Sequence, residues 1–208
     1  MLLNYIFDFD GTLADTFPAI YESWNRTCLE FKLEIPSANK IKSMMGWHLV
    51  TIAKEISQQQ DTSEIIKSYK NNYSQLTDQT QLFNGIKDVL EQLKKDKKTL
   101  FVVSAKSSLA LNQAIVNLNL REYFEEIIGA EDVTRVKPDP EAIDIILDKY
   151  GLNTSEAVMI GDALVDIQMG QNAKVKTCVV TWGACSHEQT QKFGANWTID
   201  QPYQILKI

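Results

Sequence analysis

The pattern of hydrophobic residues changes twice along the chain, and these changes predict where its elements lie. Residues 2–9 form a short apolar run that closes at Gly11, which is typical of a buried strand followed by a turn. From residue 16 to residue 80 apolar positions recur every three or four residues, so we predict three or four helices and no strand there. After residue 85 short apolar runs alternate with stretches of helical periodicity.

The alternating second half of the chain predicts a mostly parallel sheet with helices on both faces, a Rossmann-like α/β fold. Strands are expected at 100–103, 127–128, 157–160 and 177–181, and helices at 86–93, 107–118, 140–150 and from just after residue 162 to about residue 171. Asn84 is expected to cap the first of these helices. We expect residues 1–15 and 81–208 to form the α/β core, and residues 16–80 to form an inserted helical domain.

Acidic side chains follow two of the predicted strands. Asp8 and Asp10 end the first strand on the same side, because side chains alternate along a strand. Asp162 ends the strand at 157–160, and Asp166 lies one helical turn further on. Ligands of open parallel sheets bind beyond the carboxyl ends of the strands, and carboxylates gathered there suit Mg²⁺. The sequence therefore predicts a magnesium site at this end of the sheet.

Hydroxyl and ammonium groups follow two further strands. Ser104 ends the strand at 100–103, and Lys137 precedes the helix that begins near Pro140. A hydroxyl, a helix amino terminus and a lysine together suit the oxygens of a phosphate group. The chain carries a net charge of −6, so an anionic ligand requires local cations, and Mg²⁺ and Lys137 would supply them.

The composition of the chain indicates which ligands it can bind and in which cellular compartment it is expected. An acidic protein with a pI near 5.0 is poorly suited to nucleic acid or to an anionic membrane, because both demand clustered Lys and Arg. No apolar run approaches the roughly 20 residues that span a bilayer, and the amino terminus has no basic region typical of a signal peptide. Cys28, Cys178 and Cys185 are widely spaced, which favours free thiols in a reducing compartment. We expect a cytoplasmic protein.

Four segments of this chain carry a family resemblance. DFDGTLADT, VVSAKS, VKPDP and GDALVD occur in this order, and they resemble the four motifs of the haloacid dehalogenase-like hydrolase superfamily. The tail TWGACSHEQTQKFGANWTI is similar to that of the phosphoglycolate phosphatase-like branch. The resemblance covers essentially the whole chain. It implies that the helical insert at residues 16–80 is a small cap of the C1 type.

The resemblance implies a role for each matching acidic residue. Asp8 would be the nucleophile that forms an aspartyl-phosphate and a ligand of Mg²⁺. Asp10 would be the general acid and base, with its backbone carbonyl on the metal, and Asp162 would complete the metal site. Asp166 would orient metal-bound water or Lys137. The dehalogenases of this superfamily lack the second aspartate, so Asp10 argues against dehalogenation.

The second motif departs from the usual family pattern. Relatives often have Thr-Asn-Lys where this chain has Ser104-Ala105-Lys106. The serine keeps the hydroxyl that, together with Lys137, would hold the transferring phosphoryl group, whereas Ala105 offers no polar contact. Lys106 is expected to face solvent or the edge of the cap.

Residues of the cap are the candidates for reading the leaving group of the substrate. C1 caps place a specificity loop where this chain has Gly46, Trp47 and His48, although a plain surface histidine fits His48 equally well. Trp24 and the other aromatic residues of the cap are expected to belong to its core. His187 is expected to be structural or solvated.

The leading hypothesis is a Mg²⁺-dependent phosphatase that acts on a small, phosphoglycolate-like phosphorylated metabolite. A pyrophosphatase and a phosphosugar mutase of the β-phosphoglucomutase type are alternatives, and the mutase differs in passing the phosphoryl group back to a sugar. A non-catalytic sensor of phosphorylated ligands is disfavoured, because a binding module does not need the acid/base Asp10. We expect a monomer, with a dimer as the alternative.

Overall fold

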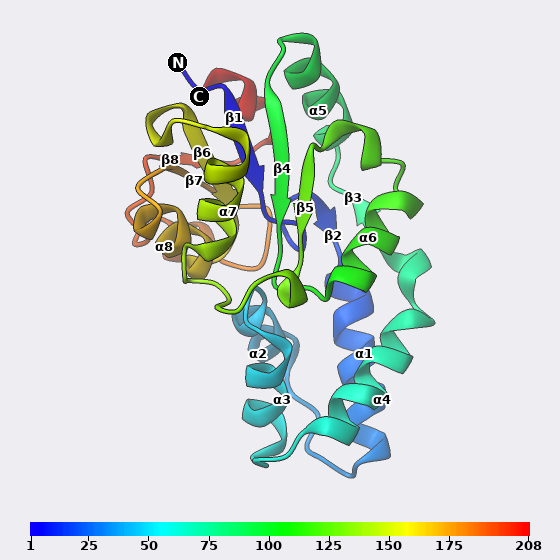
Figure 1. The fold of residues 1–208 in the computed structure, drawn as a ribbon. Helices are drawn as coiled ribbons and strands as arrows, with labels where there is room; N and C mark the ends of the chain where they lie inside the picture. The colour runs from blue at the N-terminus through cyan, green and yellow to red at the C-terminus, as the bar shows by residue number, and fades with distance from the viewer.

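The computed structural model describes residues 1–208 and contains a six-stranded parallel sheet (Figure 1). Its order is β5-β4-β1-β6-β7-β8, and every neighbouring pair is parallel. The strands are β1 (Asn4–Phe7), β4 (Thr99–Val103), β5 (Glu126–Ile128), β6 (Ala157–Gly161), β7 (Lys176–Val180) and β8 (Trp197–Ile199). The predicted Rossmann-like α/β fold is confirmed.

Helices cover both faces of the sheet, and the alternation of side chains along β1 shows why. Tyr5 and Phe7 enter the hydrophobic cluster of one face, and Ile6 enters the cluster of the other. The first cluster includes side chains of α5 (Ile86–Lys95), α6 (Ser108–Asn117) and the 3₁₀ segment η5 (Pro202–Lys207). The second includes side chains of α7 (Glu141–Tyr150) and α8 (Leu164–Asn172). Burial on both faces explains the nearly continuous apolar runs of the central strands.

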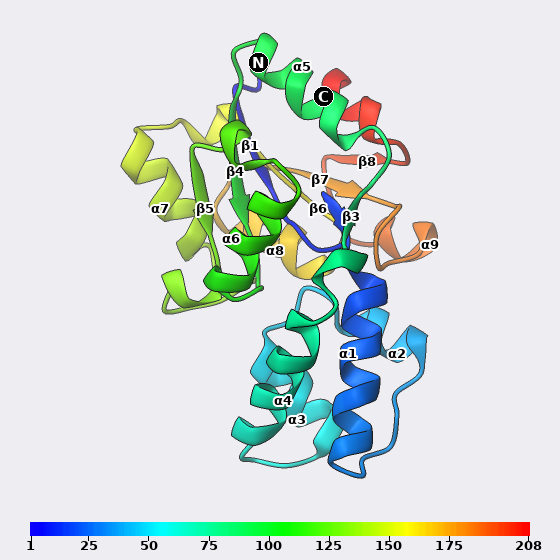
Figure 2. The same cartoon turned by 90° about the vertical axis from the view of Figure 1, so that its right-hand side faces the viewer.

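Four helices form an extension beyond the carboxyl ends of the strands (Figures 1 and 2). They are α1 (Phe17–Glu30), α2 (Ala38–Met44), α3 (Leu49–Ser57) and α4 (Ser63–Ser74), and we call them the cap. The cap has its own buried cluster, which consists of Trp24, Ile41, Met44, Ala53 and Ile65. The predicted domain limits, with residues 16–80 as one inserted unit, stay a proposal.

Two short strands mark where the chain enters and leaves the cap. β2 (Ala14–Asp15) precedes α1, and β3 (Gln81–Leu82) follows the 3₁₀ segment η1 (Thr77–Gln79). They pair antiparallel, with Ala14 opposite Leu82 and Asp15 opposite Gln81. Both termini of the chain lie at the end of the sheet that is far from the cap (Figure 1).

The start of α5 differs from the prediction. Asn84 does not cap this helix; Gly85 occupies the N-cap position with φ of 86°, and no side chain caps it. A left-handed backbone favours glycine, which has no Cβ, so the turn geometry decides the cap. Three short 3₁₀ segments were not predicted: η2 (Arg121–Tyr123), η3 (Ala130–Asp132) and η4 (Thr154–Glu156). A short helix, α9 (His187–Thr190), follows β7.

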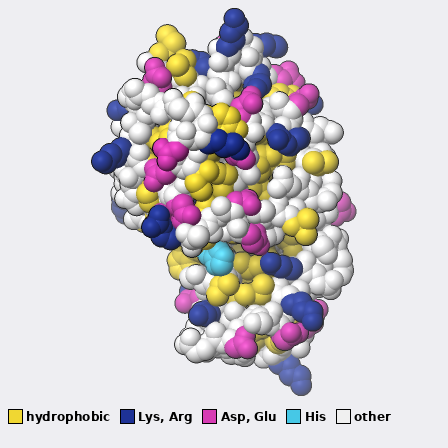
Figure 3. Space-filling view, viewed as in Figure 1, with side chains coloured by type: hydrophobic (Ala, Val, Ile, Leu, Met, Phe, Trp, Pro, Cys, Tyr) yellow, Lys and Arg dark blue, Asp and Glu magenta, His cyan; other side chains and the backbone are white.

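The surface agrees with the acidic but mixed charge of the sequence. On the face drawn in Figure 3, acidic and basic side chains are interspersed, and no continuous basic surface covers it. No helix of the structure has the length and apolar character that crossing a bilayer requires.

Replacement of Phe101 by alanine tests the central packing of the sheet. Phe101 is fully buried on β4, and its ring centroid lies 5.1 Å from that of Tyr150 on α7. We expect Phe101→Ala to lower the free energy of unfolding by about 3–5 kcal/mol in urea denaturation. Leu29→Ala, at a side chain that is 66% exposed, should change it by no more than about 0.5 kcal/mol. Equal losses in both variants would contradict this account of the core.

Candidate active site

Three of the predicted site residues lie at the carboxyl ends of three adjacent strands, on the side of the sheet that faces the cap. Asp8 directly follows β1, Ser104 follows β4, and Asp162 follows β6. Because β1 lies between β4 and β6 in a parallel sheet, the ends of all three strands meet at one edge. Residues that are 150 positions apart in the sequence thereby come together, as the hydrogen bond between Thr12 and Asp162 shows.

Three carboxylates form the acidic centre of this site. Asp8, Asp162 and Asp166 are all buried, and one carboxylate oxygen from each lies within 4.8 Å of the others. Oxygen ligands of this kind suit Mg²⁺, which takes few protein ligands and keeps positions for water and phosphate. The Asp10 carboxylate is not part of this cluster, and the role expected for Asp10 at the metal used its backbone carbonyl.

Lys137 connects two of these carboxylates. Its Nζ donates to Oδ1 of Asp8 and to Oδ1 of Asp166, at 2.7 Å each, and its side chain is only 3% exposed. Burial alone would lower the pKa of Lys137, but the two carboxylates outweigh it and raise the pKa above the usual value, so the ammonium stays charged. Oδ2 of Asp166 accepts from the backbone N–H of Ala163 at 3.0 Å, which fixes Asp166 in the first turn of α8.

Asp162 is fixed by two hydrogen bonds from other parts of the core. Its Oδ1 accepts from the Thr12 hydroxyl at 3.1 Å, and its Oδ2 accepts from the backbone N–H of Ala184 at 2.7 Å. The backbone at Gly11 passes very close to the carboxylate of Asp162. A Cβ on Gly11, whose φ is 85°, would lie 2.4 Å from Oδ2 of Asp162, so any side chain there would displace the carboxylate.

The electrostatic balance of the site favours an additional cation. Burial, reinforced by Asp166, raises the pKa of Asp162 to about 7. Burial also raises the pKa of Asp8 well above its usual range, although Lys137 opposes the shift. Lys137 is the one ammonium bonded to this cluster, and Oδ2 of Asp8 accepts no hydrogen bond. The donor set and this uncompensated charge fit a divalent metal ion.

Asp10 lies apart from the cluster and pairs with Lys106. The Nζ of Lys106 lies 2.9 Å and 3.2 Å from the two carboxylate oxygens of Asp10. The same ammonium lies 4.4 Å from the ring centroid of Tyr73, which belongs to α4 of the cap. Burial would lower the pKa of Lys106, but Asp10 and the neighbouring tyrosines raise it above the usual value.

The expectation that Lys106 faces solvent is therefore wrong, although it does lie at the edge of the cap. Its side chain is 9% exposed, because the ion pair with Asp10 and the ring of Tyr73 enclose the ammonium. Lys106 follows Ser104 at the same two-residue spacing that separates Asp8 from Asp10. That spacing is the signal in the sequence that could have placed Lys106 at the site. Nothing in the local pattern indicates the contact with Tyr73.

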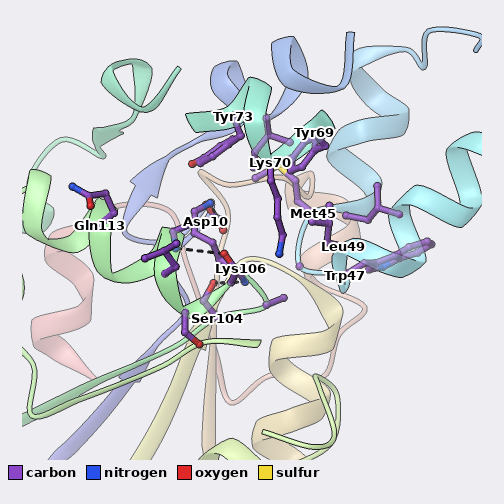
Figure 4. A pocket seen from close by; sticks show the side chains of 18 of the residues that line it. Asp10, Met45, Trp47, Leu49, Tyr69, Lys70, Tyr73, Ser104, Lys106 and Gln113 are labelled. Atoms are coloured by element: carbon purple, nitrogen blue, oxygen red, sulfur yellow. Dashed lines mark hydrogen bonds and ion pairs between the residues drawn. The ribbon is translucent and has the colours of Figure 1, made fainter. Parts of the chain in front are cut away.

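A cavity of about 870 Å³ lies between the core and the cap (Figure 4). Asp8, Asp10 and Ser104 line its core end, where Ser104 is 5% exposed and its hydroxyl accepts from the backbone N–H of Lys106 at 3.2 Å. Of the three residues proposed as a specificity loop, Gly46 and Trp47 line the cavity, whereas His48 precedes α3 and does not.

The structure also places Trp24 and His187, which were expected in the core of the cap and at a structural or solvated position. Trp24 is fully buried and belongs to the core of the cap, as expected, but it also lines the cavity. Tyr69 and Tyr73 line it as well. His187 lies at an exposed position outside the cavity lining, where its Nδ1 is 3.1 Å from Oδ1 of Asp200.

The fold and the site together define an α/β enzyme with an acidic strand-end centre beneath a helical cap. The family model for haloacid dehalogenase-like hydrolases matches residues 5–180, so this chain belongs to that family. The resemblance of the four motifs to this superfamily is confirmed. The predicted enzyme class, a phosphatase of the superfamily, is confirmed as well.

Individual relatives are similar along their whole length. Pyrophosphatase PpaX of Oceanobacillus iheyensis is 29% identical over 203 residues, which cover 98% of this chain and 94% of that protein. A structure from Bacteroides fragilis, provisionally named a haloacid dehalogenase-like hydrolase, has a TM-score of 0.90 at 27% identity and covers 99% of this chain and 100% of its own. A predicted phosphoglycolate phosphatase from Haemophilus somnus has a TM-score of 0.85 at 23% identity, with 99% and 97% covered, and shows the fold alone.

The raised pKa of Asp162 predicts a pH dependence of metal binding. Below pH 7 this carboxyl group carries a proton that a metal ion must displace, whereas above pH 8 it is ionised. The apparent affinity for Mg²⁺ should therefore fall on acidification from pH 8 to pH 6, by up to about ten-fold per pH unit below pH 7. Isothermal titration calorimetry with MgCl₂ at pH 6, 7 and 8 measures this. An affinity that is constant across the three pH values would contradict the assignment.

Proposed function

We propose that the protein is a Mg²⁺-dependent phosphatase that hydrolyses the phosphate monoester of a small metabolite through an aspartyl-phosphate on Asp8. The observation that carries this proposal is the placement of the Asp8 carboxylate. One of its oxygens is held by Lys137, the other accepts no hydrogen bond, and the side chain lines the cavity beneath the cap. A carboxylate held in this way is oriented to attack a phosphorus atom.

Asp8, Asp162 and the backbone carbonyl of Asp10 would hold the metal ion. Bound there, Mg²⁺ supplies the positive charge that lets an anionic nucleophile approach an anionic phosphate group. Lys137 contributes a second positive charge at the same place, since its ammonium lies 2.7 Å from Asp8. Ser104 lines the same end of the cavity and can donate its hydroxyl to a phosphate oxygen.

The chemistry then divides between the two aspartates of the first motif. Asp8 forms a bond to phosphorus while the bond from phosphorus to the ester oxygen breaks, and Asp10 gives a proton to the departing alcohol. Asp10 next takes a proton from a water molecule that attacks the aspartyl-phosphate. This step releases inorganic phosphate and restores the Asp8 carboxylate. Lys106 holds Asp10 in place through both steps, because it contacts both of its carboxylate oxygens.

A pyrophosphatase is the second candidate, and the names of similar proteins favour it. The relative from Oceanobacillus iheyensis is named a pyrophosphatase. The same residues could cleave a phosphoanhydride, since only the leaving group differs. A mutase of the β-phosphoglucomutase type stays the third candidate, and it differs in giving the phosphoryl group of Asp8 to a sugar phosphate instead of water. We further propose that the protein is cytoplasmic, in keeping with its three free cysteines, and that it is a monomer.

Replacement of the nucleophile tests the central step. Asp8→Asn removes the negative oxygen that attacks phosphorus, so release of phosphate from an aryl phosphate should fall by at least about 10³-fold. Chelation of the metal by EDTA should reduce the wild-type rate to a similar level, and added Mg²⁺ should restore it. Asp78→Asn, at an exposed position in η1, is the matched control and should keep the wild-type rate. Activity that survives Asp8→Asn would rule out the aspartyl-phosphate.

The proposed role of Lys106 predicts an effect that depends on the leaving group. A phenolate leaves without a proton, whereas an alkoxide needs one from Asp10. We therefore expect Lys106→Met to slow hydrolysis of an alkyl phosphate about ten-fold more than hydrolysis of an aryl phosphate, which is less than the roughly 10²- to 10⁴-fold that loss of the general acid itself would cost. Lys106→Arg should restore part of this difference, and Lys94→Met, at a surface ion pair with Glu125, should show none. Equal effects on both esters would mean that Lys106 acts on packing alone.

A further inference from the structure

The cavity beneath the cap extends well beyond the strand ends that hold the site. Its volume of about 870 Å³ falls in the range of pockets that hold drug-sized ligands, roughly 300–1,000 Å³. All four helices of the cap contribute to its wall. Figure 4 shows Asp10, Ser104 and Lys106 on one side, with Tyr69, Tyr73, Met45 and Leu49 across from them. The cap end of this space is where the leaving group of a phosphate ester would lie.

Apolar side chains line the cap end of the cavity. They include Ile20, Trp24, Ile41, Met45, Leu49 and Ile52. Trp24 is fully buried and Ile41 is 2% exposed, so the cavity reaches the hydrophobic core of the cap itself. A wall of this kind binds apolar surface and offers nothing to a second charged group.

Aromatic rings occupy one side of this wall. The ring centroids of Trp24 and Tyr69 lie 4.5 Å apart, and those of Tyr69 and Tyr73 lie 6.1 Å apart. Burial raises the pKa of Tyr69, so its phenol stays neutral. Tyr73 is only 7% exposed, and its hydroxyl has no hydrogen-bond partner in the protein. The wall therefore offers the faces of aromatic rings to a planar ring of a ligand.

The charges around the cavity argue against an anionic leaving group. Lys106 and Lys70 are the cations that line it. Lys106 is already paired with Asp10, and Lys70 is half exposed with its Nζ 3.8 Å from Oε1 of Glu131. A carboxylate or a second phosphate group placed deep in the cap end would be buried without a partner, which is strongly unfavourable.

We propose that the substrate is the phosphate monoester of an uncharged aromatic alcohol, with its ring in the apolar cap end of the cavity. This inference rests on the proposed phosphatase function and specifies its leaving group. The bond between phosphorus and the alcohol oxygen breaks, and the alcohol leaves with a proton from Asp10. Water then supplies the oxygen and one proton of inorganic phosphate, and its other proton restores Asp10. The apolar side chains and Tyr73 bind the ring and set the preference.

A substrate series tests the proposal directly. Ethyl phosphate and 2-phenylethyl phosphate have leaving alcohols of similar acidity, so a difference in their kcat/KM reports binding of the ring. We expect 2-phenylethyl phosphate to be preferred by about 10- to 100-fold, the gain expected from burying a phenyl group. Phosphoglycolate and pyrophosphate should be hydrolysed less efficiently than 2-phenylethyl phosphate. A ratio near one, or a preference for either anionic substrate, would overturn the proposal.

Binding of phosphonates separates failure of this inference from failure of the proposed function. Calorimetry with Mg²⁺ present compares 2-phenylethylphosphonate with ethylphosphonate, neither of which needs to be hydrolysed. Tighter binding of the aromatic compound without turnover of any ester would support the apolar site and refute the phosphatase. Hydrolysis of several esters, lost in Asp8→Asn, with no gain from the ring in either measurement would keep the phosphatase and refute the aromatic leaving group.

A pair of variants on one helix locates the effect in the cap. Leu49 lines the cavity, so Leu49→Arg should lower the ratio of kcat/KM for 2-phenylethyl phosphate over ethyl phosphate by at least ten-fold. Val50 is 37% exposed and does not line the cavity, so Val50→Arg should keep the wild-type ratio. Equal ratios in both variants would contradict the placement of the ring. The comparison of substrates on the wild-type protein decides the proposal even if Leu49→Arg does not fold.

Discussion

The structure of the site depends on the burial of three carboxylates around one ammonium group. Asp8, Asp162 and Asp166 lie at strand ends where water is largely excluded, and Lys137 alone among the ammonium groups bonds to them. Burial of several like charges is unfavourable unless hydrogen bonds or cations compensate. The side-chain hydroxyl of Thr12 and the backbone N–H groups of Ala163 and Ala184 supply such hydrogen bonds. The negative charge that remains uncompensated would attract a divalent cation.

The core and the cap also share a buried ammonium group next to the site. Lys106 pairs with Asp10 on the core and lies over the ring of Tyr73 on the cap, so one ammonium group contacts both sides of the cavity. The turn at Gly46 also approaches the core closely: a Cβ there would lie 3.0 Å from the Cβ of Ala163, just before α8. In the proposed function, the reaction thus depends on side chains of the core, and selectivity would depend on the side chains that the cap brings to it.

Much of the fold could be predicted from the sequence because its signals are local. Side chains alternate along β1, so Tyr5 and Phe7 lie on one face of the sheet and Ile6 on the other. The acidic residues directly follow strands, so prediction of the strands also predicts where these residues lie. The N-cap of α5 could not be predicted in this way, because the left-handed turn at Gly85 outweighs the capping preference of Asn84. Lys106 and the cavity wall depend on tertiary contacts with α4, and no periodicity along the chain encodes such contacts.

The pairing of β2 with β3 has a consequence for how such a chain is assembled. Ala14 lies opposite Leu82 and Asp15 opposite Gln81, so the chain leaves the core and returns to it at a single point. The cost of closing a loop depends on bringing its ends together, and here the two strands join those ends outside the main sheet. The four helices thus connect two paired antiparallel strands, as the loop of a β-hairpin does. An insert attached in this way can change in length and sequence while the register of the six-stranded sheet stays the same.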